Sequence, residues 1–277
     1  MLKRILVGIA GTPALPAKIS ASVDLAQRHG AEISAVSVVD VDRLSAVGPV
    51  PIGAAKYAQN LREQRIARSH KLDELALEKL ETACAEAGVP MRALRAEGDP
   101  LEVLTSNWRY QDLCILGVRG WFDYGVLPDA QNALLKLIAK GVRPIFAVTE
   151  GMKPVRAAVI AYNGSPESAK AMKQFAQMSL WPGIEVEIVC VGPPKSEEPA
   201  ETILQEAVDY CRLHGLKPSV TRMDGEVGDA LLEVATRRDA GVIVLGSSFR
   251  KIMMYQRFGK NALQLIKTSP VPLFLSH

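Results

Sequence analysis

The 277-residue chain carries one sequence pattern twice. Ile5 to Thr12 (ILVGIAGT) and Ala158 to Ser165 (AVIAYNGS) are both apolar runs that end in a glycine followed by a hydroxyl residue. Leu116-Gly117 and Leu245-Gly246 end two further apolar runs. The segments occur in the same order in both halves, so the chain is built from an internal repeat.

Two other pairs of segments extend the repeat. Gly98-Asp99 and Gly228-Asp229 each open a short helical pattern. Asn132-Ala133-Leu134 and Asn261-Ala262-Leu263 also match, and each asparagine follows the glycine at the end of the preceding apolar run by 15 positions. A chain of this length can hold two domains of about 140 residues, each large enough for its own core.

Within each half, strand-like apolar runs alternate with helix-like periods, which indicates a parallel sheet with crossover helices. The predicted fold class is α/β, with two tandem doubly wound, Rossmann-like domains that each contain a five-stranded parallel sheet. We expect strands at about 3 to 9, 31 to 39, 90 to 96, 111 to 117, 143 to 149, 155 to 161, 184 to 191, 217 to 223, 241 to 246 and 271 to 276. Helices of the second half are expected at about 167 to 179, 199 to 214, 227 to 238 and 259 to 268.

The predicted domains are residues 1–150 and 151–277, joined by the linker Glu150 to Pro154. The first copy is longer, because Gly11 to Gly98 spans 87 positions and Gly164 to Gly228 spans 64, a difference of 23. We place the extra residues at about 41–65, as a loop rich in Pro and Gly and a longer following helix. That helix has an apolar stripe of Leu72, Leu75, Ala76, Leu80, Ala83, Cys84 and Ala87. Its earlier turns carry Arg62, Arg65 and Arg68, for which a solvated face is favoured over an anion or membrane surface.

Composition excludes several classes of function. The net charge is +3 and no Lys/Arg run is dense, so nucleic acid is not an expected partner. No apolar run reaches the 18 or more residues that span a bilayer, so no membrane insertion is expected. The basic and apolar start resembles the opening of a signal peptide, but the same pattern recurs in mid-chain, where a cleaved leader would not.

The cysteines predict a reducing, cytoplasmic location. There are four, without a CxxC pair, and the four histidines are equally dispersed, so zinc-type spacing is absent. Cys114 and Cys190 lie inside apolar runs, where a reduced cysteine acts as a small hydrophobe. The other two are Cys84 and Cys211.

A doubly wound sheet binds ligands at the carboxyl ends of its strands, close to the point where the strand order reverses. In each copy, the relevant segments are the loop after the first strand and the loop between the fourth strand and the last helix. A helix N-terminus there offers backbone N–H groups and the positive end of a dipole, which suit phosphate. Glycines allow the backbone to approach such a ligand closely.

The residues at these positions resemble the universal stress protein family over nearly the whole chain, twice. In that family, the first strand ends in Asp-Gly-Ser/Thr. The fourth strand ends in Gly, which is followed by two residues, Gly, nine residues and Gly-Ser/Thr. Pro-Val-Pro precedes the last strand. The second copy has Asn163-Gly164-Ser165, Gly246-Ser247-Ser248-Phe249, nine residues, Gly259-Lys260, and Pro270-Val271-Pro272. The first has Ala10-Gly11-Thr12, Gly117-Val118-Arg119-Gly120, nine residues, Ala130-Gln131, and Val142-Arg143-Pro144.

The resemblance implies binding of ATP or another adenine nucleotide, mainly in the second copy, with Mg only as its companion and no other metal. The candidate residues there are Tyr162, Asn163, Gly164, Ser165, Val191, Gly246, Ser247, Ser248, Gly259, Lys260 and Asn261. Weak candidates in the first copy are Ala10, Gly11, Thr12, Gly117 and Gly120.

Both copies depart from the family pattern. The first copy has Ala10 where the family has the aspartate after the first strand. It has Ala130-Gln131 where the family has the Gly-Ser/Thr pair that holds phosphate. The second has Asn163, an acceptor without charge, and Lys260, a point charge for a phosphate. Phe249, in place of the second glycine, adds bulk where phosphate should pass.

Structural explanations compete with ligand binding at the same positions. The glycines serve tight turns or strand ends, and Asn132 and Asn261 cap or orient the last helix of each copy. The loops that would cover phosphate are aromatic and Met-rich, which is more typical of an interface and favours a protein partner. Their residues are Trp121, Phe122, Tyr124, Met253, Met254 and Tyr255.

The leading functional hypothesis is a regulatory or signalling protein of the stress type. The resemblance implies that the copies pack as an internal pseudo-dimer through the strands near 143–149 and 271–276, and the intact chain is expected to form a homodimer. One alternative is an interaction scaffold with vestigial sites. Another is a weak ATPase or nucleotidyl-transfer enzyme, which has less support because no catalytic residue, His motif or Ser, His and Asp arrangement can be named.

Overall fold

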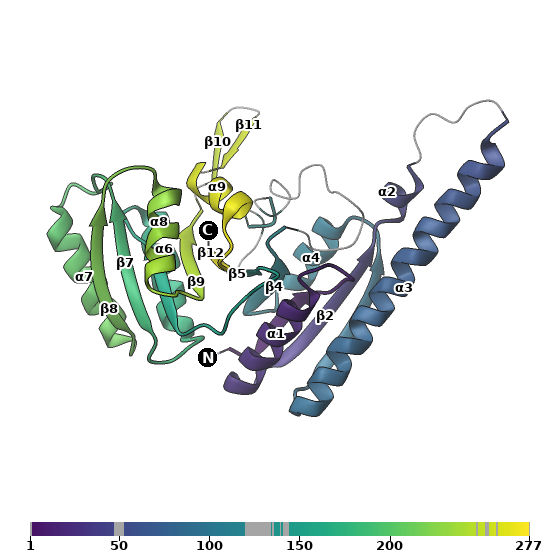
Figure 1. Ribbon diagram of the computed structural model, residues 1–277, viewed down its shortest axis with the longest axis horizontal. Helices are drawn as coiled ribbons and strands as arrows, with labels where there is room; N and C mark the ends of the chain where they lie inside the picture. The colour runs from purple at the N-terminus through teal and green to yellow at the C-terminus, as the bar shows by residue number, and fades with distance from the viewer. Residues whose placement is uncertain are drawn as a thin grey trace.

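The computed structural model describes residues 2–46, 53–119, 134, 136–138, 140, 144–247, 249–252, 255–258 and 260–276. Side chains are described for these residues except 249–252, 255–258, 260 and 261. The chain forms two α/β halves that follow one another in sequence and share one sheet (Figure 1).

The first half has strand order β3-β2-β1-β4-β5, with all neighbours parallel. The connections from β1 and β4 diverge at the β1–β4 boundary, which is the switch point of a doubly wound sheet. Its elements are β1 (Arg4–Gly8), α1 (Leu15–His29), β2 (Glu32–Val39), α2 (Val41–Ser45), α3 (Ala55–Ala87), β3 (Met91–Glu97), α4 (Pro100–Trp108), β4 (Leu113–Gly117) and β5 (Ile145–Val148).

The second half repeats this order as β8-β7-β6-β9-β12, again with parallel neighbours. Its elements are β6 (Ala157–Ala161), α6 (Pro166–Met178), β7 (Glu185–Val191), α7 (Ala200–Leu213), β8 (Lys217–Met223), α8 (Val227–Arg237), β9 (Val242–Gly246), β10 (Phe249–Ile252), β11 (Tyr255–Phe258), α9 (Lys260–Thr268) and β12 (Leu273–Ser276). The ten strands predicted from periodicity are confirmed, since each lies within two residues of its expected bounds.

The halves join through β5 and β12, which pair antiparallel and merge both sheets into one of ten strands. Phe146 of β5 is the register partner of Phe274 of β12. Trp181 packs against Phe146 with ring centroids 5.3 Å apart, and Phe175 packs against Phe274 at the same separation. The expectation that the strands near 143–149 and 271–276 meet is confirmed, and the fold is an intramolecular pseudo-dimer.

Two layers of helices cover the sheet. Helices α1, α3, α6 and α7 bury their apolar residues on one face, and α4, α8 and α9 bury theirs on the other. The inner strands are buried along their whole length, as in β4 (LCILG), because helices cover both of their faces. The edge strands β3 and β8 are the most exposed and carry charged side chains, which discourages pairing with another chain.

Helix α3 is the largest difference between the halves, with 33 residues against 14 in α7. Its first turns extend beyond the body of the domain (Figure 1), and Arg62, Arg65 and Arg68 are exposed there. The prediction that Leu75 belongs to the buried stripe is wrong, because its side chain is 44% exposed. The buried side of the helix is instead defined by Asp73, Ala76, Leu77, Leu80 and Cys84.

Both Gly-Asp pairs open a helix, as expected. Asp99 is the N-cap of α4, and Gly228 and Asp229 lie in the first turn of α8, whose N-cap is Glu226. One other expectation requires correction. Tyr255, expected in a loop, lies in β11, which forms an antiparallel two-stranded ribbon with β10. Within the described ranges, no helix is long and apolar enough to cross a membrane.

Candidate functional site

A cavity of about 210 Å³ opens at the carboxyl ends of β6, β7 and β9 in the second half. This is the switch point of the sheet, where doubly wound folds bind ligands. The cavity is lined by Ala161, Tyr162, Asn163, Ser165, Glu167, Ser168, Val189, Val191, Lys195, Val227, Leu231, Leu245, Gly246 and Ala262. Five of the predicted site residues, Tyr162, Asn163, Ser165, Val191 and Gly246, are thus brought together.

The Asn163-Gly164-Ser165-Pro166 segment shapes one rim of the cavity. Asn163 Oδ1 accepts a hydrogen bond from the Ser165 backbone N–H at 3.1 Å, which closes a turn over Gly164. Gly164 has φ of 77°, in the left-handed region that favours glycine. Ser165 is the N-cap of α6, its Oγ accepts from the Ser168 N–H at 3.3 Å, and Pro166 opens the helix.

Gly246 ends β9 and allows α6 to approach the sheet. A Cβ atom at this position would lie 2.3 Å from the Glu167 backbone oxygen, closer than real contacts allow. The glycine is therefore needed to seat the first turn of α6 against the strand, in addition to lining the cavity. This close contact brings the segment that follows β6 next to the end of β9.

The interior of the cavity is apolar. Val189 and Val191 come from β7, Val227 and Leu231 from α8, and Leu245 from β9. These side chains offer hydrophobic contact to a ring, and polar residues line the same cavity, a combination typical of small-molecule sites.

Tyr162 lines the cavity, but its side chain packs against the face of the sheet that α6 and α7 cover. Burial, together with nearby acidic groups such as Glu198, raises the pKa of Tyr162. The phenol is therefore protonated at neutral pH and can donate a hydrogen bond.

Two ionisable side chains of opposite sign line the cavity, Glu167 and Lys195. Lys195 lies in the loop between β7 and α7, and its backbone N–H donates to the Asn163 carbonyl oxygen at 2.7 Å. Lys195, Glu167 and Ser168 were not predicted from the sequence. A loop lysine after a Gly-Pro-Pro turn carries no periodic signal, and only the fold places it at the rim.

The other residues predicted for the site of the second half are not among those that line the cavity. Ser247 is buried, and its N–H donates to the Ser276 carbonyl oxygen at 2.8 Å, so its backbone extends the pairing of β9 with β12. Lys260 and Asn261 open α9, and their side chains are not described. Ser248, Gly259, Met253 and Met254 lie outside the described residues.

The equivalent position in the first half is filled. The strand registers place Ala10 and Val38 where the second half has Asn163 and Val191, and both are 0% exposed. Gly11 is close to helix α3, since a Cβ there would lie 3.2 Å from Leu72 Cβ. The buried Thr12 Oγ1 has no hydrogen-bond partner among the described residues.

Gly117 ends β4 as expected. Several other positions named for the first copy lie outside the described residues, namely Gly120, Trp121, Phe122, Tyr124, Ala130, Gln131 and Asn132.

A buried polar group in the first half was also missed. Lys18 of α1 is 0% exposed and its Nζ donates to the Gly8 carbonyl oxygen at 2.9 Å. Asp73 of α3 is 4% exposed and accepts from Ser37 Oγ at 2.6 Å. Lys18 falls on the apolar face of α1 by its spacing from Leu15, Ala21 and Leu25, and this was the available signal.

Among the described residues, no group of His, Cys, Asp and Glu side chains is arranged to hold a metal ion. The sequence model of the universal stress protein family matches residues 1–121 and 154–277. The chain belongs to the universal stress protein family. No curated protein matches this sequence.

Solved structures show the same fold over the whole chain. A universal stress protein from Archaeoglobus fulgidus superimposes with a TM-score of 0.66 at 15% identity, over 99% of this chain and 97% of that chain. A functionally unknown protein from Pseudomonas aeruginosa PAO1 superimposes with a TM-score of 0.61 at 15% identity, over 99% and 92%. At 15% identity, these similarities establish the fold of this universal stress protein but do not identify a ligand.

Proposed function

We propose that this universal stress protein is a regulatory or signalling protein whose second domain binds an adenine nucleotide. The observation that carries the proposal is the cavity at the ends of β6, β7 and β9. It is lined by five of the residues that the family resemblance predicts from the sequence. Its apolar walls suit an aromatic base, and Asn163 and Ser165 supply hydrogen-bonding groups for a sugar.

The first domain plays a supporting role in this proposal. Ala10 and Val38 are fully buried and Leu72 covers Gly11, which leaves no equivalent opening at these residues. The division into domains of residues 1–150 and 151–277, a homodimer of the intact chain and a cytoplasmic location belong to the same proposal. All four cysteines are buried and unpaired, which fits a reducing compartment.

An interaction scaffold is the second candidate, and the size of the cavity favours it. About 210 Å³ is small against the roughly 300–1,000 Å³ of typical small-molecule pockets. In a scaffold, the site of the second domain would be vestigial like that of the first.

Isothermal titration of the intact protein with ATP, ADP, AMP and adenosine separates these candidates. We expect micromolar binding that Val191→Trp abolishes, because the indole would fill the cavity. Val220→Trp is the matched control, since Val220 is 40% exposed on the edge strand β8 and does not line the cavity. Absence of binding for all four compounds at millimolar concentration would establish the scaffold.

A further inference from the structure

The last strand of each domain is already paired inside the protein. Strand β5 lies between β4 and β12, and β12 lies between β5 and β9, so both have a neighbour on each side. The edges of the ten-stranded sheet are β3 and β8, whose charged side chains discourage pairing with another chain. We therefore expect a dimer of the intact chain to form through helices.

Helix α3 has two parts of opposite charge. Among its exposed side chains, residues 55–71 carry five basic groups and one acidic group, and residues 72–87 carry four acidic groups and one basic group. The five basic residues are Lys56, Arg62, Arg65, Arg68 and Lys71, and the four acidic residues are Glu74, Glu78, Glu81 and Glu86. No ion pair joins any of these nine to another described residue.

This order of charges is unfavourable in a single helix and favourable in an antiparallel pair. The N-terminus of a helix is the positive end of its dipole, so basic residues there and acidic residues at the other end are misplaced. When two copies of α3 pack antiparallel, the basic part of each lies along the acidic part of the other. The helix is thus complementary to itself, as a twofold symmetric dimer requires. Its 33 residues extend over about 50 Å, and its first turns project from the domain (Figure 1).

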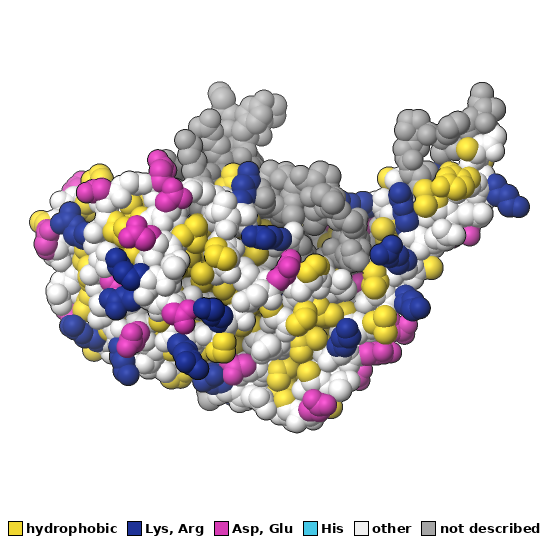
Figure 2. All heavy atoms as spheres, viewed as in Figure 1, with side chains coloured by type: hydrophobic (Ala, Val, Ile, Leu, Met, Phe, Trp, Pro, Cys, Tyr) yellow, Lys and Arg dark blue, Asp and Glu magenta, His cyan; other side chains and the backbone are white. Residues whose placement is uncertain are grey.

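An apolar groove lies beside the middle of the helix. It has a volume of about 660 Å³, lies between α1 and α3, and includes Leu15, Ile19, Leu72 and Leu75 in its lining. Figure 2 shows hydrophobic side chains gathered over α1 and the adjoining part of α3. Leu75 is 44% exposed although it is surrounded by this apolar lining. Exposed apolar surface bordered by charged residues is typical of an interaction site.

The apolar and charged positions agree on one register. Arg68 lies five residues before position 73, and Glu78 lies five residues after it. They are also seven and three residues from Leu75, spacings that place both on the same side of the helix as Leu75. An antiparallel pairing with its twofold axis at the level of position 73 therefore puts Leu72 and Leu75 at the centre. It also puts Arg68 of each copy opposite Glu78 of the other.

We infer that α3 is the surface through which a second copy of this chain binds. The two α3 helices pack antiparallel, with the apolar groove at the centre and an Arg68–Glu78 ion pair on each side of the axis. The inference rests on the homodimer included in the proposed function and names its interface. It also gives a role to the turns by which α3 exceeds α7.

Sedimentation velocity of the intact protein tests the inference, in a buffer of low ionic strength because exposed ion pairs weaken with salt. Wild type should have the mass of two chains at micromolar concentration. Arg68→Glu and Glu78→Arg should each raise the dissociation constant of the dimer at least about tenfold, since like charges would then face each other. Lys170→Glu, at an exposed position of α6, makes the same change of charge as Arg68→Glu and should dimerise as wild type.

Mixing the two charge variants tests the antiparallel arrangement. In a dimer of one Arg68→Glu chain with one Glu78→Arg chain, a glutamate faces an arginine at both contacts. The equimolar mixture should therefore dimerise about as tightly as wild type. Recovery in the mixture also shows that both variants fold.

Leu75→Asp tests the centre of the contact. It should also give a monomer, because the dimer would bury two carboxylates. Its melting temperature should stay close to that of Lys170→Glu at protein concentrations where neither variant forms a dimer, since Leu75 is 44% exposed in the single chain.

Three results would overturn the inference. If wild type is a monomer, the proposed homodimer fails too, while nucleotide binding by the second domain is unaffected. If wild type is a dimer that all three α3 variants leave intact, the homodimer stands and uses another surface. If the charge variants dissociate but their mixture does not recover, the helices do not pair antiparallel in this register.

Discussion

Lys18 is the most unusual residue of the first domain, because a lysine side chain is almost never fully buried. Burial lowers the pKa of Lys18 to about 7, and the nearby negative charge of Asp73 partly opposes this. The group lies between β1, β2 and α3, so it helps to fix the long helix to the sheet.

Lys18 predicts a stability that rises with pH. The unfolded lysine has a pKa of about 10.4, so between pH 7 and 10 the unfolded state binds more protons than the folded state. Its contribution is therefore full above the unfolded pKa and is lost as pH falls toward 7. In urea unfolding at pH 7, 8 and 9, the free energy of unfolding of wild type should rise more steeply than that of Lys18→Met. Parallel curves would contradict the low pKa.

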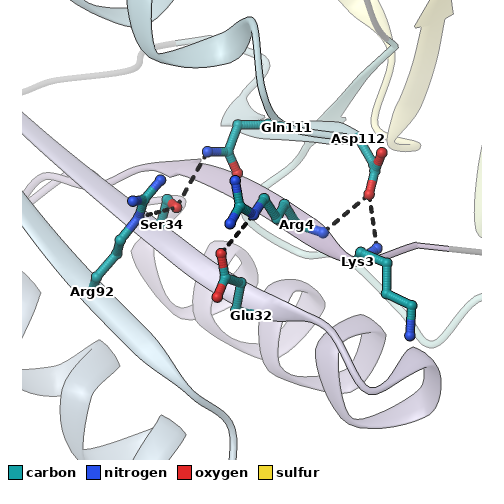
Figure 3. Close-up of polar contacts among 7 residues, drawn as sticks. All are labelled: Lys3, Arg4, Glu32, Ser34, Arg92, Gln111 and Asp112. Atoms are coloured by element: carbon teal, nitrogen blue, oxygen red, sulfur yellow. Dashed lines mark hydrogen bonds and ion pairs between the residues drawn. The ribbon is translucent and has the colours of Figure 1, made fainter.

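Glu187 is a buried charged residue of the second domain. The sheet registers place it where the first domain has Ser34, which accepts hydrogen bonds from Arg92 and Gln111 (Figure 3). The Glu187 carboxylate is buried and is held by Ser219, Thr221 and Arg238. The same position of the sheet is thus a carboxylate in the second domain and a neutral hydroxyl in the first.

Glu187 predicts acid sensitivity. Burial alone would raise the pKa of Glu187, but hydrogen bonds from Ser219 and Thr221 and the charge of Arg238 outweigh it and lower the pKa. The stabilisation is present above the unfolded pKa of about 4.3 and is lost as pH falls through the folded pKa.

Glu187→Gln should reduce the free energy of unfolding by about 1–3 kcal/mol at pH 7, and this deficit should shrink below pH 4. Glu185→Gln, at an exposed position of the same strand, is the control for both pH values. A deficit that is equal at pH 7 and pH 3.5 would show that the charge is not responsible.

At the scale of elements, the approach of α6 to β9 determines the shape of the cavity. The contact depends on Gly246, since any side chain would meet the backbone of Glu167. Helix α6 also contributes Ser165 and Ser168 to the rim, so a shift of this helix would change both walls of the site.

Gly246→Ala should destabilise the protein by about 1–3 kcal/mol, because α6 must move to admit the methyl group. Gly151→Ala is the control, since a Cβ there meets nothing within 4 Å and the effect should stay within about 0.5 kcal/mol. Thermal unfolding by circular dichroism measures both. Equal melting temperatures for the two variants would mean that the helix is not seated as described.

Helix α3 shows how one element can distinguish the two domains. The first part of α3 carries all three arginines of the helix, and the second part carries the acidic residues that follow Lys71. Figure 2 shows this division, with Lys and Arg side chains toward the projecting end of the helix and Asp and Glu side chains toward the other end. This placement runs against the helix dipole, so packing of Leu77, Leu80 and Cys84 must hold the second part in place.

At the scale of the whole molecule, the antiparallel pairing of β5 with β12 joins the two domains in one continuous sheet. The aromatic side chains around Phe146, Phe175, Trp181 and Phe274 come from both halves, and each is almost fully buried. His29 at the end of α1 also lies 3.1 Å from the Leu180 carbonyl oxygen of the second half. Loss of either half would expose a central strand of the sheet.

We therefore expect a single cooperative unfolding transition in guanidinium chloride. Phe146→Ala should destabilise it by about 3–5 kcal/mol, because it leaves a cavity between the halves. The midpoint of the whole transition should shift, in circular dichroism and tryptophan fluorescence alike. A variant in which only part of the transition moves would show that the domains unfold separately. Leu213→Ala, at a residue 85% exposed, is the control and should leave the midpoint unchanged.

The sequence by itself determined the fold and the edge of the sheet at which the cavity lies. Strand and helix periods are local, and so are the glycines and prolines that end them, which is why all ten strands of the main sheet were placed. The ribbon of β10 and β11 was missed, because its short strands lie in a segment that also matched a loop. Asn163, Ser165, Val191 and Gly246 were found because they stand at strand ends, which a doubly wound sheet gathers at one edge.

Only the tertiary structure decided which distant groups meet at those ends. Lys195 reaches the cavity through a loop hydrogen bond, and Lys18 meets Asp73 across 55 positions of sequence. The exposure of Leu75 depends on how α3 rotates against α1 and β2. Such pairings depend on packing between elements, and packing is set by the shapes of all the side chains together, for which no local pattern exists.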